Sequence, residues 1–284
     1  DWWSLQPIVK QPVPTIDGDR WSRNDIDRFI LAKLKTKKLN PSPRADPRTL
    51  VRRIYIDLVG LPPPAEIIDK FENAPSQTAW EQLADDLLAS QHYGERWARH
   101  WLDVVRFGES DGYEYNAPRN TSWHYRDWVI RALNDDMPYD QFTRMQLAGD
   151  ILKPDTLEGA AAVGFLVAGT HNRVLGKSPA MKAAGRHEEL EEIAGTVAQT
   201  FLGLTVNCAR CHDHKFDPIS TREYYQFIAA LSGVTHGSRQ ITDLAKPASR
   251  NKIRILEDER DSLQGQLVNW IWERNGFTET ATNQ

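Results

Sequence analysis

Residues 208–212 of the chain read Cys208-Ala209-Arg210-Cys211-His212, and these two cysteines are the only ones among its 284 residues. The spacing is C-x-x-C-H, the pattern through which a c-type haem is attached to a protein. Each thiol can add to one vinyl group of the haem, and the adjacent imidazole can reach the iron. The segment therefore predicts one covalent haem c (heme c), bound through Cys208 and Cys211, with His212 as the proximal iron ligand.

Other interpretations of this segment stay open. Cys208, Cys211 and His212, with His214, could hold zinc, although structural zinc sites usually draw ligand pairs from two separate segments. The two cysteines could form a redox disulfide, but that use is typical of a βαβ context, which the flanking residues lack. They could also be two buried cysteines beside a hydrogen-bonded histidine, with no cofactor.

The composition, 40% hydrophobic and 26% charged residues, is ordinary for a globular protein. The formal net charge of −4 gives no general attraction to nucleic acid. No run of about 18 apolar residues occurs that could span a membrane. Covalent haem attachment takes place on the exported side of a bacterial membrane. A periplasmic or otherwise exported location is therefore expected. This expectation rests on the haem prediction alone, because no targeting segment is visible in the sequence.

Helical periodicity runs through most of the chain, and no long strand-like alternation is found. Asn24 or Asp25 is expected to cap a first helix after an extended segment, 1–23. Loops are expected at 108–123 and 169–186. Further helices are predicted at Arg48–Val59, from Pro64, and at Thr78–Ala89, Gly94–Phe107, Trp123–Leu133, Tyr139–Leu152, Glu188–Leu202 and Arg222–Leu231. The predicted fold is mostly α, an irregular multi-helix domain with long loops around the haem.

The C-terminal part of the chain has a different pattern. Apolar residues recur near heptad spacing over 251–273, at Ile253, Leu256, Leu263, Leu267 and Trp270. This pattern predicts the start of a helical hairpin or coiled coil. We therefore expect a haem-binding domain over residues 1–240, and over 241–284 a linker and helical arm towards a downstream domain.

Several motifs recur in the order found in one known family. They include Tyr93-Gly94-Glu95-Arg96-Trp97, Met137-Pro138-Tyr139-Asp140-Gln141-Phe142, Gln146-Leu147-Ala148-Gly149-Asp150 and Cys208 through Pro218. With these motifs the chain resembles the planctomycete-type cytochrome c domain family, long catalogued as a domain of unknown function. The family occurs in large exported proteins of planctomycetes, often between an upstream cytochrome domain and a downstream partner domain. The resemblance implies haem and export.

The distal iron ligand is the open question of the predicted haem site. The methionines Met137, Met145 and Met181 all precede the motif, whereas small c-type cytochromes place the ligating Met after it. His214 is too close to His212 to reach the opposite face of the ring. His100, on the helix with Trp97 and Trp101, is the first candidate. The alternatives are His187, His124, His171 and an open iron.

An open iron would suggest catalysis. Its predicted substrate wall is the loop from Asp111 to Tyr115 with Arg119 and residues 123–126, and the candidate catalytic residues are Tyr113, His124 and Arg126. Aromatic side chains mixed with carboxylates and arginine suit a sugar. The same residues could equally form a solvated loop tied by ion pairs, or a clamp for the haem propionates.

These observations predict a c-type cytochrome module that carries electrons within an exported multi-domain oxidoreductase. Its expected partner is a redox protein or an adjacent cytochrome domain, and a carbohydrate is the candidate substrate. One alternative is a haem enzyme with an open, peroxidase-like iron. The other is a non-catalytic binding module in which haem or zinc is structural.

Overall fold

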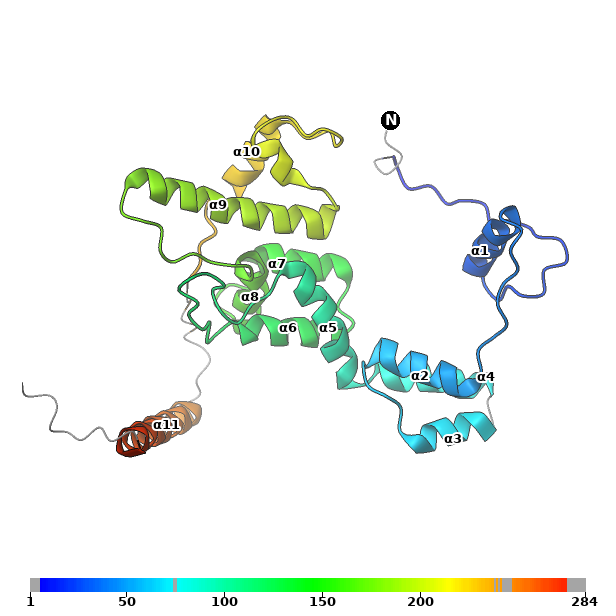
Figure 1. The fold of residues 1–284 in the computed structure, drawn as a ribbon, viewed down its shortest axis with the longest axis horizontal. Helices are drawn as coiled ribbons and strands as arrows, with labels where there is room; N and C mark the ends of the chain where they lie inside the picture. Colours follow the sequence, from blue (N-terminus) through cyan, green and yellow to red (C-terminus); the bar gives the residue numbers. More distant parts are fainter. Residues whose placement is uncertain (1–5, 74–75, 238, 240, 242–246, 275–284) are drawn as a thin grey trace, which may run out of the picture. The chain divides into compact units, whose positions relative to one another are not determined.

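The computed structural model describes residues 6–73, 76–237, 239, 241 and 247–274. These residues are mostly helical, which confirms the predicted fold class, and their β structure is limited to an isolated bridge between Ser110 and Pro118. The helices, labelled in Figure 1, are α1 (Asp25–Thr36), α2 (Pro47–Leu58), α3 (Ala65–Asn73), α4 (Gln77–Leu88), α5 (Gln91–Val105), α6 (Trp123–Asn134), α7 (Tyr139–Leu152), α8 (Leu157–Ala162), α9 (Pro179–Val197), α10 (Thr221–Ala230) and α11 (Pro247–Arg274).

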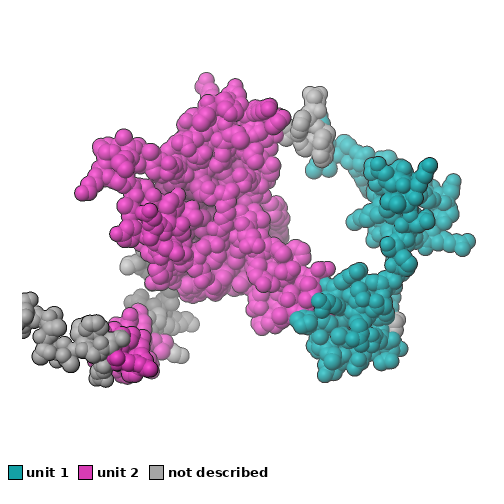
Figure 2. Space-filling model, viewed as in Figure 1, with its two compact units in different colours: residues 1–54, 62–77 teal, residues 55–61, 78–284 magenta. Residues whose placement is uncertain are grey.

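The chain divides into two compact units, residues 1–54 with 62–77 and residues 55–61 with 78–284 (Figure 2). The first unit holds α1, α3 and most of α2. Asn24 caps α1 as predicted, since its side chain accepts a hydrogen bond from the Asp27 amide at 2.9 Å. Arg48 of α2 pairs with Glu72 of α3 at 2.6 Å. The domain boundary expected near residue 240 stays a prediction.

The main core of the second unit lies among α5, α6, α7 and α8. Trp101, Trp128 and Phe142 stack or meet edge to face in it, and the polar side chain of Gln146 is fully buried beside them. Gln146 accepts hydrogen bonds from the Trp101 indole at 2.8 Å and the Tyr125 hydroxyl at 2.7 Å. Because these groups form hydrogen bonds with one another, the buried amide of Gln146 makes the packing more specific and is not left without hydrogen-bond partners.

The packing of α5 on α6 depends on a close approach at Gly94. The Gly94 amide donates to Asn134 Oδ1 at 2.8 Å, and a Cβ atom at residue 94 would lie 2.5 Å from the Ile130 carbonyl oxygen. Only a glycine therefore fits at this crossing.

A second, smaller core holds the segment that contains the C-x-x-C-H motif. In Figure 1, α9 lies between α10 and the layer of α6, α7 and α8. The buried side chains that join α9, the motif segment and α10 are Leu190, Ala194, Ala198, Val206, Ala209, Tyr224 and Ile228. The motif segment is thus packed on two helices through its apolar residues.

The last helix, α11, is 28 residues long, and its side chains are exposed at residues 255–271 and 274. Among them are Leu256, Leu263, Leu267 and Trp270, four of the five residues with the heptad-like spacing. The side chain of the fifth, Ile253, lies outside those that the structure describes. The expected end of this arm, beyond Arg274, lies outside the described residues. Within the described part of the chain, no helix combines the length and the apolar character needed to cross a membrane.

Candidate functional site

The C-x-x-C-H segment follows directly from the end of α9. There the helix passes into a π-helical turn, η3 (Ala198–Leu202), and the chain then turns at Gly203, whose φ of 67° suits glycine. A 3-10 helix, η4 (Val206–Arg210), comes next. Val206 and Ala209 lie three residues apart on η4, and both are buried. Residues three apart share one face of a 3-10 helix, so Cys208 is left on the outward side.

Both cysteines are free thiols at exposed positions, and His212 is exposed beside them. The Nδ1 atom of His212 lies 2.8 Å from the Asp213 carbonyl oxygen. Because a carbonyl only accepts hydrogen bonds, Nδ1 is the donor, and in the neutral imidazole Nε2 then has a lone pair. Histidines that ligate metals are usually oriented in this way. The donor set therefore fits the haem that the motif implies, with two thiols for the vinyl groups and one imidazole nitrogen for the iron.

His214 has a structural role instead. Its Nδ1 accepts the amide N–H groups of Phe216 at 3.2 Å and Asp217 at 2.8 Å, and its Nε2 lies 3.1 Å from Thr205 Oγ1. The side chain is only 6% exposed. Since both ring nitrogens are engaged within the loop, neither is available to a metal ion.

The motif does not form a ready-made zinc site. Tetrahedral zinc brings its donor atoms within about 4 Å of one another. In the part of the chain that the structure describes, one group of at least three His, Cys, Asp or Glu side chains has its ligand atoms within 4.8 Å of one another, and that group is His171, Glu189 and His236. Cys208, Cys211 and His212 are therefore not gathered around a single point.

Polar contacts tie the motif to α9 and α10. Arg210 donates to the carboxylate of Glu191 on α9, and the Tyr225 hydroxyl on α10 donates to the Arg210 carbonyl oxygen at 3.3 Å. Next to Tyr225, the hydroxyl of Tyr224 is buried and has no hydrogen-bond partner. Burial and the nearby Glu191 carboxylate raise the pKa of Tyr224 to about 12.

His100, the first candidate for the distal position, and His187, one of the three alternative histidines, have different surroundings. His100 is exposed on α5, with its ring 5.5 Å from that of Trp97. His187 lies on α9 beside Tyr225 at 5.8 Å between ring centroids, and its Nε2 is buried without a partner. Since Tyr225 also contacts Arg210, one residue connects His187 to the motif. The choice of distal ligand stays a prediction.

The predicted substrate wall includes a buried ion-pair cluster. Asp111 is 1% exposed and pairs with Arg119 at 3.0 Å and Arg173 at 2.6 Å. Arg119 also donates to the carbonyl oxygens of Val167 and Ala168, at 3.2 and 3.1 Å. Burial alone would raise the pKa of Asp111, but the hydrogen bonds from the two arginines outweigh it and lower the pKa. Asp111 and Arg119 are therefore built into the fold.

The three candidate catalytic residues each have partners of their own. Tyr113 is 45% exposed and lines a cavity described below. His124 stacks on Trp123 with ring centroids 3.6 Å apart, and burial lowers its pKa. Arg126 pairs with Glu109 at 2.5 Å and with Asp127 at 3.1 Å. Their catalytic role stays a prediction.

Their neighbour Tyr125 belongs to the core and not to the wall. It is 3% exposed, and its hydroxyl contacts Trp101 and Gln146. Burial raises its pKa.

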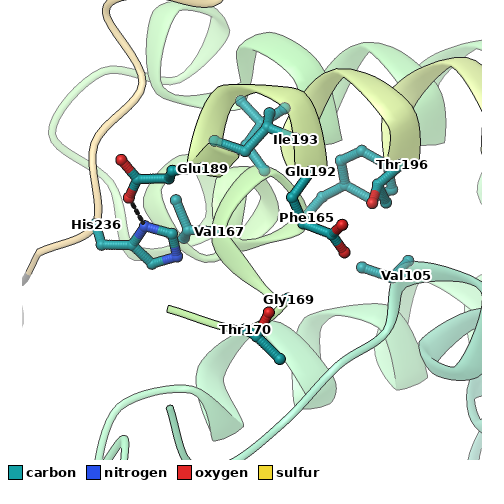
Figure 3. A pocket seen from close by; sticks show the side chains of 11 residues that line it. Val105, Phe165, Val167, Gly169, Thr170, Glu189, Glu192, Ile193, Thr196 and His236 are labelled. Carbon is teal, nitrogen blue, oxygen red and sulfur yellow. Dashed lines mark hydrogen bonds and ion pairs between the residues drawn. The ribbon is translucent and has the colours of Figure 1, made fainter. Parts of the chain in front are cut away.

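A second polar cluster joins three segments that are distant in the sequence. The imidazoles of His171 and His236 are stacked with centroids 4.0 Å apart, and both point Nδ1 at Glu189 of α9. The Oε1 atom of Glu189 lies 3.3 Å from His171 Nδ1 and 2.5 Å from His236 Nδ1, as drawn for His236 in Figure 3. Burial, more than any other effect, lowers the pKa of His236.

Two cavities adjoin this cluster. One, of about 10 Å³, contacts Glu189 and His236 and has apolar walls from residues such as Val105, Phe165 and Ile193 (Figure 3). The other, of about 110 Å³, is polar and is lined by Tyr113, His171, Asn172, Glu188, Glu189 and Glu192, among others. Glu189 lines both.

Sequence analysis missed two members of this cluster, Glu189 and His236, and considered His171 only as a distal ligand. None of the three has neighbours with a recognisable metal-binding spacing. They meet because α9 and two loops pack together, so no local signal could have found them.

The fold and the motif together define a helical protein with a C-x-x-C-H segment on its surface. The model of the family PSCyt2, described as a protein of unknown function (DUF1549), matches residues 25–236, and the chain belongs to this family. No curated protein and no solved structure matches the chain.

Proposed function

We propose that this protein is a c-type cytochrome module that carries electrons within an exported multi-domain oxidoreductase. The observation that carries the proposal is the state of the motif. Its two thiols are free and exposed, and His212 has Nδ1 fixed by a carbonyl group and Nε2 available. Two thiols and one oriented imidazole are the donor set that a covalent haem requires.

Each residue of the motif has a defined part in this proposal. Cys208 and Cys211 would form the thioethers, and His212 would ligate the iron through Nε2. When bound, the haem supplies one-electron transfer. Asp213 orients His212 through its carbonyl oxygen, and its carboxylate accepts the Thr221 amide at 2.8 Å, which ties the motif to the start of α10. This contact limits rotation of the imidazole.

The surroundings of the motif also support a large apolar ligand. Leu202 and Phe216, which flank the motif in the sequence, are 64% and 67% exposed. A haem bound at the motif would shield exposed apolar side chains of this kind from water. Partner proteins, a carbohydrate substrate and a periplasmic location belong to the same proposal, and they rest on the haem and on the family resemblance.

The test is a pyridine haemochrome spectrum of the denatured chain after production with c-type maturation. We expect covalent haem with the α band of two thioethers. Cys208→Ala combined with Cys211→Ala should abolish haem that survives denaturation, whereas either single variant should leave one thioether and shift the band. Zinc without haem in the wild-type chain, or covalent haem in the double variant, would contradict the proposal.

A matched set of histidine variants tests the iron ligands. His212→Ala should disturb the spectrum of the native protein, and His214→Ala should leave the iron ligation intact. A change from low-spin to high-spin iron in His100→Ala or His187→Ala would identify the distal ligand. High-spin iron already present in the wild-type protein would favour the peroxidase-like alternative over electron transfer.

A further inference from the structure

Beyond the motif, the cluster of His171, Glu189 and His236 has the composition of a metal site. One ligand atom of each residue lies within 4.8 Å of the other two. Ligands of a tetrahedral ion at about 2.1 Å are separated from one another by about 3.4 Å. The distance of 3.3 Å between His171 Nδ1 and Glu189 Oε1 agrees with that value. Glu189 Oε1 and His236 Nδ1 are closer, at 2.5 Å, so these two atoms would have to separate by about 1 Å to admit an ion between them.

The two carboxylate oxygens of Glu189 contact different groups. Arg186, one turn earlier on α9, donates to Oε2, whereas both imidazoles approach Oε1. Arg186 also donates to the carbonyl oxygens of Ser232, at 2.9 Å, and Val234. One arginine thus orients the carboxylate and holds the segment that carries His236. Such fixing of ligands by an outer layer of hydrogen bonds is typical of metal sites.

The segment of His171 is held by a different arginine. The His171 amide donates to the Asp111 carbonyl oxygen at 2.9 Å, and the Asp111 side chain is fixed by Arg119 at 3.0 Å. All three candidate ligands are therefore positioned by contacts that do not use their metal-binding atoms.

One ring nitrogen in the cluster lacks a partner. His236 Nδ1 faces Glu189, and His236 Nε2 is buried with no hydrogen bond. A neutral imidazole that donates through Nδ1 has a bare lone pair on Nε2, and a buried polar atom without a partner calls for an explanation. A cation in the cluster would provide one, either by binding that lone pair or by replacing the proton between Glu189 and His236.

From this geometry we propose that His171, Glu189 and His236 bind a divalent transition-metal ion of the zinc or ferrous kind. Two imidazoles and one carboxylate suit such ions and leave coordination positions open. His171 and Glu189 also line the polar cavity of about 110 Å³, which can hold water or a small oxygen ligand on those open positions. The proposal does not depend on the haem, because none of these residues belongs to the motif.

Equilibrium dialysis of the purified full chain against Zn²⁺, with zinc and iron counted separately, tests the site. We expect about one zinc per chain, and a loss of affinity of about 10-fold or more in His171→Gln, His236→Gln and Glu189→Gln. His92→Gln is the matched control, because His92 faces Glu95 at 2.8 Å without a third ligand among the described residues. Its zinc content should equal that of the wild-type chain.

A further variant separates this site from the motif. Zinc binding should persist when Cys208 and Cys211 are both replaced by alanine. If zinc is lost in that variant only, or if the wild-type chain binds none, the assignment is wrong. His236 is largely buried, so His171→Gln, at the most exposed ligand, is the decisive variant if His236→Gln fails to fold. Unchanged zinc affinity in His171→Gln would overturn the proposal.

Discussion

His212 and His214 are two residues apart and have opposite surroundings. His212 is exposed and keeps one nitrogen free, whereas His214 is 6% exposed and uses both nitrogens within its loop. The difference follows from the chain direction after Cys211, which turns residues 214–217 back towards Thr205. A histidine next to a binding motif is thus best assigned from its hydrogen bonds.

Replacement of His214 should loosen the loop without touching the donor set. His214→Ala leaves the amides of Phe216 and Asp217 without their acceptor, and we expect a loss of about 2 kcal/mol in the free energy of unfolding. Thr205→Val removes only the contact to Nε2 and should cost about 1 kcal/mol. Urea unfolding measures both, and an equal loss in the two variants would contradict the assigned roles.

Asp111 should make the stability of the protein sensitive to acid. Its folded-state pKa is lowered, so the charged form stabilises the fold above the unfolded-state pKa of about 3.9. That contribution is lost as the pH falls through the lower, folded-state value. Asp111→Asn should lower the free energy of unfolding by about 3 kcal/mol at pH 7. The difference in the free energy of unfolding between this variant and the wild-type protein should become smaller below about pH 4.

Chemical denaturation at a series of pH values follows this difference. Asp140→Asn is the control, because the Asp140 side chain is 71% exposed and its partner Arg144 is 4.0 Å away. A surface pair of this kind contributes little. If the free energies of unfolding of the wild-type protein and Asp111→Asn differ by the same amount from pH 7 to pH 3, the charged Asp111 carboxylate does not stabilise the fold.

At the scale of elements, helix crossings in the second unit depend on small residues. Gly94 allows α5 and α6 to meet closely, and Gly159 on α8 does the same against α7, where a Cβ atom would lie 2.5 Å from the Gly149 carbonyl oxygen. These contacts are between backbones, which cannot move aside as a flexible side chain can. The two crossings therefore set the distances between the helices that enclose the main core.

Gly94→Ala should therefore destabilise the protein by about 2 kcal/mol, since the added methyl group meets the Ile130 carbonyl oxygen. Gly265→Ala in α11 is the matched control, because nothing lies within 4 Å of the Cβ position there. Alanine in an open helical position is neutral or stabilises by up to about 1 kcal/mol. Thermal unfolding distinguishes the two, and equal effects would contradict the steric argument.

At the scale of the whole molecule, the α11 side chains that the structure describes, at residues 255–271 and 274, are all exposed. A chain shortened to residues 1–241 should therefore keep the thermal unfolding midpoint of the second unit. Calorimetry of the full and shortened chains measures this. A lower midpoint in the shortened chain would mean that α11 packs on the remaining helices.

Most of the fold could be predicted from the sequence because its signals are local. Asn24 caps α1, and the periodicity over 123–133 and 139–152 gives α6 and α7. The loop expected at 169–186 was wrong in its second half, since Ser178 caps α9 and Pro179 begins it. Ser followed by Pro is a helix-start signal.

Side-chain environments were harder to predict than helices. On α5, Trp97 and Val104 are 40% and 51% exposed, although the neighbouring Val105 is fully buried. The sequence has no information about which part of a broad apolar stripe meets a neighbour. The C-x-x-C-H motif could be found from the sequence because its residues are adjacent. The cluster of Glu189 and His236 could not, because only tertiary packing brings these residues together.

The π-helical turn η3, just before the motif, has a consequence for the evolution of the family. A π turn contains one residue more than an α turn. Removal of that residue would restore a regular helix and rotate everything beyond it by about 100° about the helix axis. Relatives that differ by one residue between Ala194 and Leu204 would then direct their thiols to another side of the molecule, so the length of this segment is a marker for a different placement of the motif.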